Sequence, residues 1–531
     1  MKLDSFDSIH RKPVLGRNLI ATSQPLASQA GAIAFAKGGN AVDAVLAAAI
    51  TLTVVEPVMN GLGGDAFALY WDGNHLHGLN GCGRAPKGWS LERFKGMTAM
   101  PKQGWETVTV PGQVAAWVDL SDRFGDLPFE MLFDDAIRHA MDGFPVSPVI
   151  ASQWHQATLD LGAEPGFEAF MPGGRAPKAG EIWRFADQAV TLKEIARTHG
   201  RSFYEGRLAK CITDFAAQCG AALSADDLRA HESAWVEPIG QAFEDVTVHE
   251  IPPNGQGIAA LIALGIMKHL PYAQTKPGSA QRAHLEIEAM RLAFADLYAH
   301  IGDPDAMQTS SEALLDDAYL KQRAALVDVA KAGTYPAGQP GSGGTVYLCA
   351  ADAQGRMISY IQSNFKGFGS GVVVPGTGIS LHNRGMAFSL QPGHPNVVAP
   401  AKRPLHSIIP AFMMRGDEPL MAFGVMGGNM QAQGHLQMTL RCVTEGLNPQ
   451  AASDAPRWRI NDVGDLIMEA EWPAEVIEQL RQMGHDPKVQ PTGSLDFGSA
   501  QLIARLPAVN GETVAYVGGS DTRRDGQVIG Y

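Results

Sequence analysis

A threonine at the end of a glycine-rich stretch is the residue of this chain best placed to act as a nucleophile. Residues 333–344 (GTYPAGQPGSGG) contain five Gly and two Pro, which is the composition of a linker, and Thr345 follows directly. If the Thr345 hydroxyl attacked the carbonyl of Gly344, an N-to-O acyl shift and hydrolysis would leave Thr345 as a new N-terminus. Its free α-amine, with an ordinary pKa of about 7.7–8.0, could then act as the base for its own hydroxyl. The three residues alone carry little weight, because Gly-Gly-Thr is more often a loop that enters a strand.

Strands are expected to follow Thr345. Residues 345–351 and 356–362 alternate between apolar and polar, and Asp352-Ala-Gln-Gly355 between them is a hairpin signal. Further short strands are expected at 372–374, 379–381 and 408–413. The last third of the chain is therefore predicted to be rich in strands.

The part of the chain before the linker is predicted to be mainly helical. Ser23-Gln24-Pro25 resembles a helix cap, and that helix should stop at Gly38-Gly39. A second helix is expected from Ala41 to the residue before Pro57, buried rather than membrane-spanning because it is short and carries Asp43. The expected elements further along are a strand at 67–71, helical patterns through most of 125–335, and one of these helices at 284–300.

Composition and charge describe an ordinary globular protein. Hydrophobic residues make up 45% and charged residues 18% of the 531 residues, and the net charge is −13. That charge argues against nucleic acid or an anionic membrane as a partner. The first fifteen residues lack an apolar run, so a secretory signal is not expected.

Cysteine and histidine usage predicts neither a metal nor a cofactor. The five cysteines are scattered and none forms C-x-x-C, and the 16 histidines show no paired ligand spacing on a helix. Cys211 and Cys219, eight residues apart in an apparent helix, are too far apart to form a disulfide. This usage favours a reducing, cytoplasmic location.

Motifs along nearly the whole chain resemble the γ-glutamyltransferase (γ-glutamyltranspeptidase) family in order and spacing. The run Gly38-Gly-Asn-Ala-Val-Asp-Ala44 and the pair Gly427-Gly428 are the most specific matches. The other matching segments are 26–31 (LASQAG), 61–64 (GLGG), 110–114 (VPGQV), 252–257 (PPNGQG), 292–296 (LAFAD), 368–371 (FGSG) and 403–405 (RPL).

The resemblance implies an N-terminal-nucleophile hydrolase of the α/β (α+β) class. Its fold would be a four-layer αββα sandwich built from two fragments of one precursor, a large subunit 1–344 and a small subunit 345–531, cleaved between Gly344 and Thr345. The fragments would stay associated, alone or as a dimer of such pairs. By the same resemblance, the N–H groups of Gly427 and Gly428 would form the oxyanion hole, and Ser363 would assist the nucleophile.

The residues expected to bind substrate depart from the family pattern. Typical members hold the substrate's α-carboxylate with an Arg at the position of Leu91 here, so Arg84 or Arg93 is the candidate carboxylate ligand instead. Either could equally be a solvated surface residue. The Asp that holds the substrate's α-amine is replaced by Met386.

Further candidates for binding the substrate lie in the last third of the chain. The Ser-Ser pair that follows Arg-Pro-Leu in the family is here His406-Ser407. Asn364 and Asn383 are additional candidates.

Three functions are therefore weighed. The first is an autoprocessing hydrolase or acyltransferase that passes a γ-glutamyl or related carboxylate-bearing acyl group from a small amide to water or an amine. The second is an amidohydrolase for a dicarboxylic monoamide without an α-amine, of the oxamate or glutaryl (cephalosporin acylase) type, because a buried ammonium without an acceptor is costly. The third is a non-catalytic binding homologue that stays uncleaved. No G-x-S-x-G, H-E-x-x-H or phosphate-binding loop motif favours another enzyme class.

Overall fold

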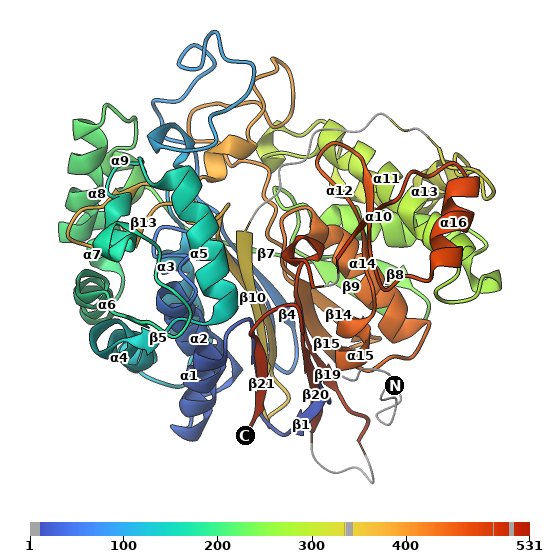
Figure 1. The fold of residues 1–531 in the computed structure, drawn as a ribbon, viewed down its shortest axis with the longest axis horizontal. Helices are drawn as coiled ribbons and strands as arrows, with labels where there is room; N and C mark the ends of the chain where they lie inside the picture. The colour runs from blue at the N-terminus through green and yellow to red at the C-terminus, as the bar shows by residue number, and fades with distance from the viewer. Residues whose placement is uncertain (1–10, 334, 336–343, 492, 509–513) are drawn as a thin grey trace.

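The computed structural model describes residues 11–333, 335, 344–491, 493–508 and 514–531. Most of the expected linker, residues 334 and 336–343, lies outside the described residues. Within the described part, two seven-stranded sheets face each other at the centre of the molecule (Figure 1).

The first sheet is assembled from both ends and the middle of the chain. Its strands, in spatial order, are β1 (Val14–Gly16), β20 (Tyr516–Ser520), β19 (Ala500–Arg505), β15 (Glu418–Val425), β14 (Ala411–Arg415), β9 (Val246–Glu250) and β8 (Ile239–Phe243). All of its pairings are antiparallel.

The second sheet carries Thr345 near its centre. Its strands, in spatial order, are β21 (Gln527–Gly530), β2 (Leu19–Thr22), β10 (Gly344–Ala351), β11 (Met357–Phe365), β3 (Asp65–Trp71), β4 (Leu76–Gly81) and β7 (Ala234–Val236). β10 and β11 form the expected hairpin, with β11 running three residues past its expected end. Contacts of β10 with β15 and β19 join the two sheets.

Helices cover the outer face of each sheet, which completes four layers (Figure 1). The side of the second sheet carries α1 (Pro25–Ala36), α2 (Ala41–Val55), α3 (Gln113–Phe124), α4 (Asp134–Asp142), α5 (Pro148–Leu161), α6 (Ala186–Thr198), α7 (Arg201–Glu205), α8 (Arg207–Gln218) and α9 (Ala225–Arg229). The side of the first sheet carries α10 (Gly257–Lys268), α11 (Ala280–His300), α12 (Ser311–Leu314), α13 (Asp317–Ala324), α14 (Met430–Val443), α15 (Pro449–Asp454) and α16 (Ala474–Gln482). The expected αββα architecture is confirmed.

The first two helices form where their caps predict. The Gln24 side chain accepts from the N–H groups of Leu26 and Ala27, and Pro25 occupies the first turn of α1. Asn40 and Asp43 form a reciprocal capping box at the start of α2. Every residue of α2 is buried, so the prediction of a buried helix is confirmed.

The prediction of helices through 125–335 is incomplete, because β7, β8 and β9 lie inside that range. These strands have three to five residues each; β8 and β9 are buried only in part, and β7 has no buried residue. Such short segments give little alternation to read. The strand expected at 408–413 begins instead at Ala411.

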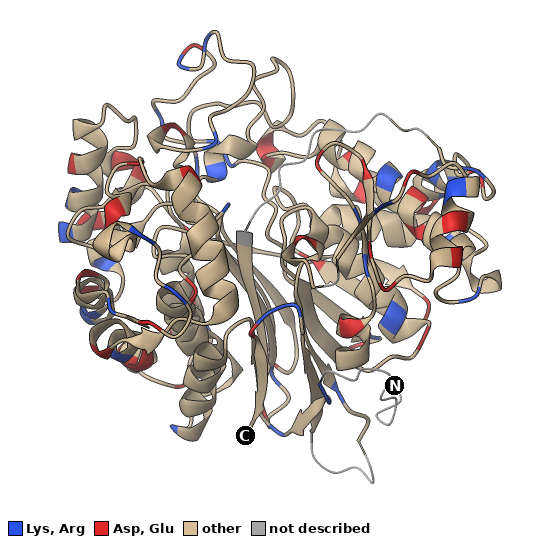
Figure 2. Cartoon of the chain, viewed as in Figure 1, with Lys and Arg blue, Asp and Glu red and all other residues tan. Residues whose placement is uncertain are grey.

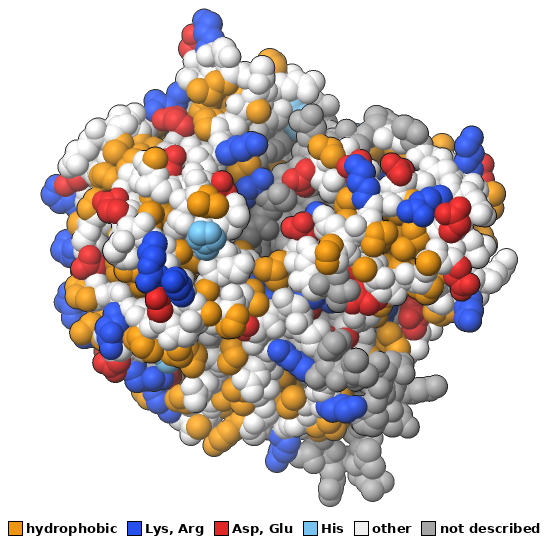
Figure 3. All heavy atoms as spheres, viewed as in Figure 1, with side chains coloured by type: hydrophobic (Ala, Val, Ile, Leu, Met, Phe, Trp, Pro, Cys, Tyr) orange, Lys and Arg blue, Asp and Glu red, His pale blue; other side chains and the backbone are white. Residues whose placement is uncertain are grey.

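Charge and surface shape follow the layers. Lys, Arg, Asp and Glu lie mainly on the outer helices and loops, while the strands carry few of them (Figure 2). The face seen in Figure 3 is hollowed near its centre, between the helices that cover the two sheets. Among the described residues, no helix combines the length and the apolar composition needed to cross a bilayer. All five cysteines are free thiols.

Candidate active site

Thr345 lies at an irregularity in the centre of the second sheet. The pairing of β10 with β11 shifts register between Gly344 and Val346, which places Thr345 at a bulge. A bulge re-aims the side chain that it carries. The Thr345 side chain is buried, at 1% exposure, so its surroundings are fixed by neighbouring protein atoms.

Two side chains contact the Thr345 hydroxyl. The Oγ1 atom lies 3.4 Å from the Ser363 Oγ of β11 and 3.3 Å from the Gln431 Nε2 of α14. The Gln431 Oε1 accepts from the Ile409 N–H at 3.0 Å, so the Nε2 is the atom that faces Thr345. Gln431 therefore donates to Thr345, which leaves the Thr345 proton free to point toward Ser363.

Gln431 is not among the site residues predicted from the sequence. The available signal was its position three residues after Gly428, in the first turn of the helix that begins at Met430. A side chain in that turn lies at the same helix N-terminus as the proposed oxyanion donors.

Gly427 and Gly428 form the turn between β15 and α14. Their φ angles are 117° and 62°, in the region that favours glycine. Among the described residues, neither backbone N–H donates a hydrogen bond to the protein. Because they also precede the N-terminus of a helix, whose dipole favours negative charge, these two donors are suited to an oxyanion.

Asn364 follows Ser363 in β11, and the Asn383 N–H donates to the Asn364 carbonyl at 3.2 Å, but the two side chains differ in what they have left to offer a substrate. The Asn364 Nδ2 donates to Ser380 Oγ at 3.0 Å, whereas its buried Oδ1 has no partner among the described residues. Both ends of the Asn383 amide are occupied, since its Nδ2 donates to the Lys102 carbonyl and its Oδ1 accepts from the Lys366 N–H.

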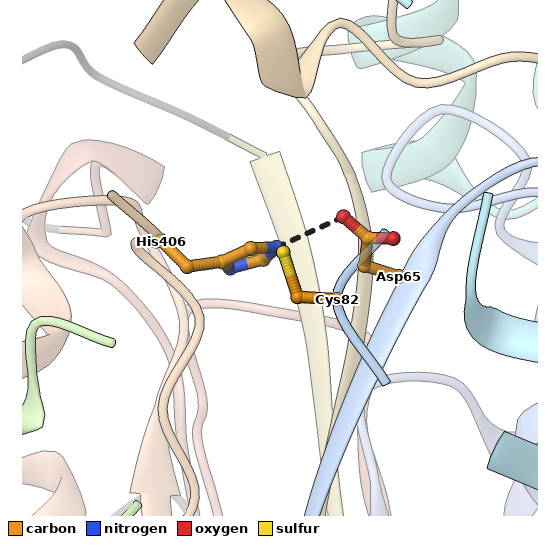
Figure 4. A group of neighbouring side chains, drawn as sticks. All are labelled: Asp65, Cys82 and His406. Atoms are coloured by element: carbon orange, nitrogen blue, oxygen red, sulfur yellow. Dashed lines mark hydrogen bonds and ion pairs between the residues drawn. The ribbon is translucent and has the colours of Figure 1, made fainter. Parts of the chain in front are cut away.

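His406 belongs to a buried group around Asp65 (Figure 4). Its Nε2 lies 3.0 Å from the Asp65 Oδ2, and its Nδ1 accepts from the Ile408 N–H at 3.3 Å. His406 is therefore a neutral imidazole that donates to a carboxylate. The His382 Nδ1 lies 3.3 Å from the same oxygen.

Burial and these contacts shift the pKa values in opposite directions. Burial alone would raise the pKa of Asp65, but the His382 and His406 imidazoles beside its carboxylate outweigh burial and hold the pKa well below its usual range. Burial, together with the charge of Arg384, lowers the pKa of His406 to about 3. Burial raises the pKa of the neighbouring Cys82 thiol far above its usual range. Asp65 thus provides a fixed negative charge next to His406 and His382.

Two buried groups contain residue types that bind metals, but their atoms already have protein partners. In the first group, Asp65 and Cys82 also interact with the backbone, through Gly83 and Gly112 N–H donors and the Gly83 carbonyl. The second group comprises His284, Glu288 and His485. There, the two imidazoles hydrogen-bond each other at 2.8 Å, and Glu288 accepts from Gly333 and Arg291. Neither arrangement leaves a set of free donors for an ion.

The structure places Arg84 and Arg93 in ion pairs. Arg93 forms a two-point pair with Glu106, its Nε lying 2.7 Å from that carboxylate. Arg84 lies 3.3 Å from Asp303 and donates to the Ala401 carbonyl. Neither residue lines the cavity described next.

A cavity of about 820 Å³ reaches the residue that follows the Gly427–Gly428 turn. Its lining includes Gln256, Met386, His406, Ser407 and Asn429, the residue that follows Gly428. The Gln256 Nε2 donates both to the Ser407 carbonyl and, at 2.8 Å, to the Gly428 carbonyl. Ser407 is therefore linked to the glycine turn through a single side chain. Arg384, which the sequence reasoning also left out, is a further lining residue.

Comparison with known proteins identifies the family. The model of the gamma-glutamyltranspeptidase family matches residues 27–531. The chain is 33% identical to the glutathione hydrolase-like YwrD proenzyme of Bacillus subtilis, over 98% of this chain and 99% of that protein. It is 35% identical to the oxamate amidohydrolase proenzyme of Klebsiella pneumoniae, over 98% of this chain and 100% of that protein.

A solved structure agrees with these matches. The cephalosporin acylase of Bacillus halodurans superposes with a TM-score of 0.93 at 43% identity, covering 100% of this chain and 99% of that one. The family and its similar members are amide-cleaving or amide-transferring enzymes of the N-terminal-nucleophile fold, several of them named as proenzymes. The chain belongs to the gamma-glutamyltranspeptidase family.

Proposed function

We propose that this protein is an autoprocessing amide hydrolase whose nucleophile is the Thr345 hydroxyl. The observation that carries the proposal is the position of the Thr345 Oγ1, in contact with Ser363 and Gln431 next to the glycine turn. Gln431 connects the two parts, because its side chain contacts Thr345 and its N–H donates to the Gly428 carbonyl at 3.1 Å.

The first step is cleavage of the precursor between Gly344 and Thr345. The Thr345 Oγ1 attacks the carbonyl carbon of Gly344, the acyl group moves from nitrogen to oxygen, and water hydrolyses the ester. The products are a carboxylate on Gly344 and a free α-amine on Thr345. That amine supplies the base that the buried hydroxyl otherwise lacks.

The mature enzyme then repeats the attack on a substrate amide. The α-amine takes the Thr345 proton as the Oγ1 bonds to the substrate carbonyl carbon. The resulting oxyanion accepts hydrogen bonds from the N–H groups of Gly427 and Gly428, a pair of preorganised donors worth several kcal/mol. The α-ammonium protonates the leaving amine, and water or an amine acceptor releases the acyl group from Thr345.

The acyl group is proposed to carry a carboxylate but no α-amine. Met386, which stands where the family has an amine-holding Asp, lines the cavity and offers an ammonium only a thioether. The name of the oxamate amidohydrolase points to a substrate of this kind for that protein. A γ-glutamyl group is the second candidate, favoured by the similarity to a glutathione hydrolase-like protein.

We also propose a cytoplasmic location, on the ground that all five cysteines are free thiols. Such thiols suit a reducing compartment.

The test is a denaturing gel followed by a substrate comparison. The purified protein should give two bands that sum to the mass of the full chain, and Thr345→Ala should give one. A single band from the wild type after long incubation would favour the uncleaved binding homologue. The cleaved enzyme is then assayed with oxamate, a glutaryl anilide and a γ-glutamyl anilide, and a strong preference for the γ-glutamyl compound would refute the choice of acyl group.

A further inference from the structure

One buried cation in the cavity wall lacks most of its hydrogen bonds. Arg384 is fully buried, and its Nη1 donates to the Ser407 Oγ at 2.9 Å. Its Nε and Nη2 have no partner among the described residues. A guanidinium carries five N–H donors, and buried donors left unsatisfied are costly, so a group of this kind calls for an explanation.

The two unpartnered nitrogens share one edge of the guanidinium. The Nε–H and one Nη2–H of an arginine point in the same direction and form the fork that binds both oxygens of a carboxylate. The nitrogen that is engaged, Nη1, is the one outside this fork. Ser407 thus orients the guanidinium without occupying the edge that binds anions.

Neighbouring groups hold Arg384 in place but leave it without a bound counterion. Its guanidinium lies 4.0 Å from the centre of the Phe365 ring, a cation–π contact. Phe365 adopts a φ of 77°, a strained conformation for a residue with a side chain, and such strain is concentrated at functional sites. The Asp65 carboxylate is engaged by His406 and His382 rather than by Arg384.

Arg384 stays charged and forms no ion pair with the described residues. Burial lowers the pKa of Arg384 to about 10, which leaves the guanidinium protonated at neutral pH. The other arginine in the lining, Arg323, forms an ion pair with Asp296 at 3.0 Å. Among the described lining residues, Arg384 is therefore the cation that a bound anion would neutralise.

We propose that Arg384 is the specificity-determining residue that binds the carboxylate of the acyl group through its Nε and Nη2. This inference rests on the proposed function, because it takes the bond cleaved to be the amide at the other end of the same acyl group. Ser407 and Gln256 connect Arg384 to the Gly428 carbonyl, and Arg384 and Asn429, the residue after Gly428, line the same cavity, in which the carboxylate and the reacting carbonyl would both bind. The substrate class is a short dicarboxylic monoamide.

The experiment compares an acid substrate with its neutral counterpart. Wild type and Arg384→Gln are assayed with oxamate and a glutaryl anilide, and with the two compounds in which a carboxamide replaces the carboxylate. For whichever acid the wild type cleaves faster, Arg384→Gln should lower kcat/KM by about 100-fold or more while changing the neutral compound less than about threefold. Arg384→Lys keeps the positive charge but loses the two-pronged donor, so its kcat/KM on the acid substrate should lie between those of the wild type and Arg384→Gln.

The control is Arg441→Gln, which removes a second buried guanidinium outside the cavity. Arg441 donates to the carbonyls of Ala452, Ala455 and Pro456. Its loss should lower stability but leave the acid-to-neutral ratio unchanged. An equal loss on acid and neutral substrates in Arg384→Gln, or no loss on the acid, would overturn the proposal.

A binding measurement separates this proposal from the proposed function. Glutarate or oxalate should raise the Tm of the wild type, whereas the matching diamides should not, and Arg384→Lys should weaken the effect. If the protein neither cleaves itself nor cleaves any amide, the proposed function fails and this measurement alone decides the role of Arg384. Equal Tm shifts in wild type and Arg384→Lys would then reject that role.

Discussion

At the scale of single residues, the proposed nucleophile depends on partners that are distant in the sequence. Ser363 lies 18 residues after Thr345 and Gln431 lies 86 residues after it. Thr345 and its glycine donors could be inferred from motifs, because the linker, the strand pattern and the Gly-Gly pair are local signals. Gln431 and Arg384 could not, since Gln431 matters through its contact with Thr345 and Arg384 through the nitrogens that it leaves unpaired, and both depend on the folded chain.

Replacement of Gln431 by Glu should slow catalysis. The change keeps an acceptor for the Ile409 N–H but replaces the donor to the Thr345 Oγ1 with a carboxylate. We expect kcat to fall about 10- to 100-fold, corresponding to ~1.4–3 kcal/mol. The carboxylate should also raise the pKa of the Thr345 α-amine, so the pH–rate profile should move to higher pH.

The matched control is Gln433→Glu on the same helix. Gln433 exchanges hydrogen bonds with the backbone of Ile460, away from the nucleophile. This variant should lose stability and keep both kcat and the pH–rate profile. An unchanged profile and rate in Gln431→Glu would show that the contact with Thr345 has no catalytic role.

At the scale of elements, the turn between β15 and α14 sets the geometry of the proposed oxyanion hole. β15, the central strand of the first sheet, ends at Val425, and the helix begins at Met430, two residues beyond Gly428. The turn can be this tight because both glycines adopt positive φ. Substitutions in this turn therefore test whether it forms the oxyanion hole.

Gly427→Ala should abolish most of the activity. A Cβ at this position would lie 3.0 Å from the Gly498 Cα and 3.3 Å from the Met430 Cβ, so the turn must shift. We expect kcat to fall about 100- to 1000-fold, as for loss of one oxyanion donor. Gly446→Ala, at a positive φ in open space past the end of α14, adds strain alone and should keep kcat. Similar kcat values for the two variants would contradict this role of the turn.

A second prediction concerns the contact between α11 and β16 (Trp458–Ile460). The Glu286 carboxylate accepts from the Trp458 Nε1 at 3.0 Å, and burial raises the pKa of Glu286 to about 7. Between pH 4.5 and 7 the folded protein therefore retains a proton that the unfolded chain releases. The free energy of unfolding contributed by this group falls as the pH rises through that window.

Glu286→Gln should remove this dependence. Measured by urea unfolding in the uncleaved Thr345→Ala background, the stability of the variant relative to its parent should improve from pH 5 to pH 8 by up to about 3 kcal/mol. Glu475→Gln, at an exposed position of α16, should show no such change. If the free energies of unfolding of variant and parent differed by the same amount at both pH values, the prediction of a buried, protonated Glu286 carboxyl would be wrong.

The sequence predicted elements best where local signals were strong. α1 and α2 have caps and long apolar runs, and the β10–β11 hairpin has alternation on both sides of a turn. β7, β8 and β9 were missed because each is short, and β7 and β9 also gain their stability from pairing with strands far along the chain, β7 with β4 and β9 with β14. The order of strands in each sheet is likewise a long-range property, and only the family resemblance indicated the four layers.

At the scale of the whole molecule, the chain on either side of Thr345 contributes to both sheets. β10 and β11 lie between β2 and β3 in the second sheet, and β14 and β15 lie between β9 and β19 in the first. Segments 1–344 and 345–531 are thus two parts of one sandwich rather than two independent domains. Neither could bury its strands without the other.

After cleavage the two fragments should therefore stay together. The cleaved protein should elute from a size-exclusion column at the same volume as uncleaved Thr345→Ala, and should separate into two species only in denaturant. The segment 345–531 expressed alone should be insoluble or unfolded, because its sheet edges would be exposed. Separation of the fragments in native buffer would contradict the interleaved fold.

Because Thr345 lies at the start of an interior strand, the proposed cleavage also makes folding harder to reverse. The intact chain folds by a unimolecular search, in which its own length keeps all strands within reach. Once the chain is cleaved, an unfolded molecule could refold only if its two fragments associated, so the refolding rate would depend on the concentrations of both fragments. The working life of the mature enzyme is then measured by a half-life rather than by an equilibrium constant. The cleavage proposed to create the active enzyme would therefore also remove the unimolecular pathway by which the intact chain folded.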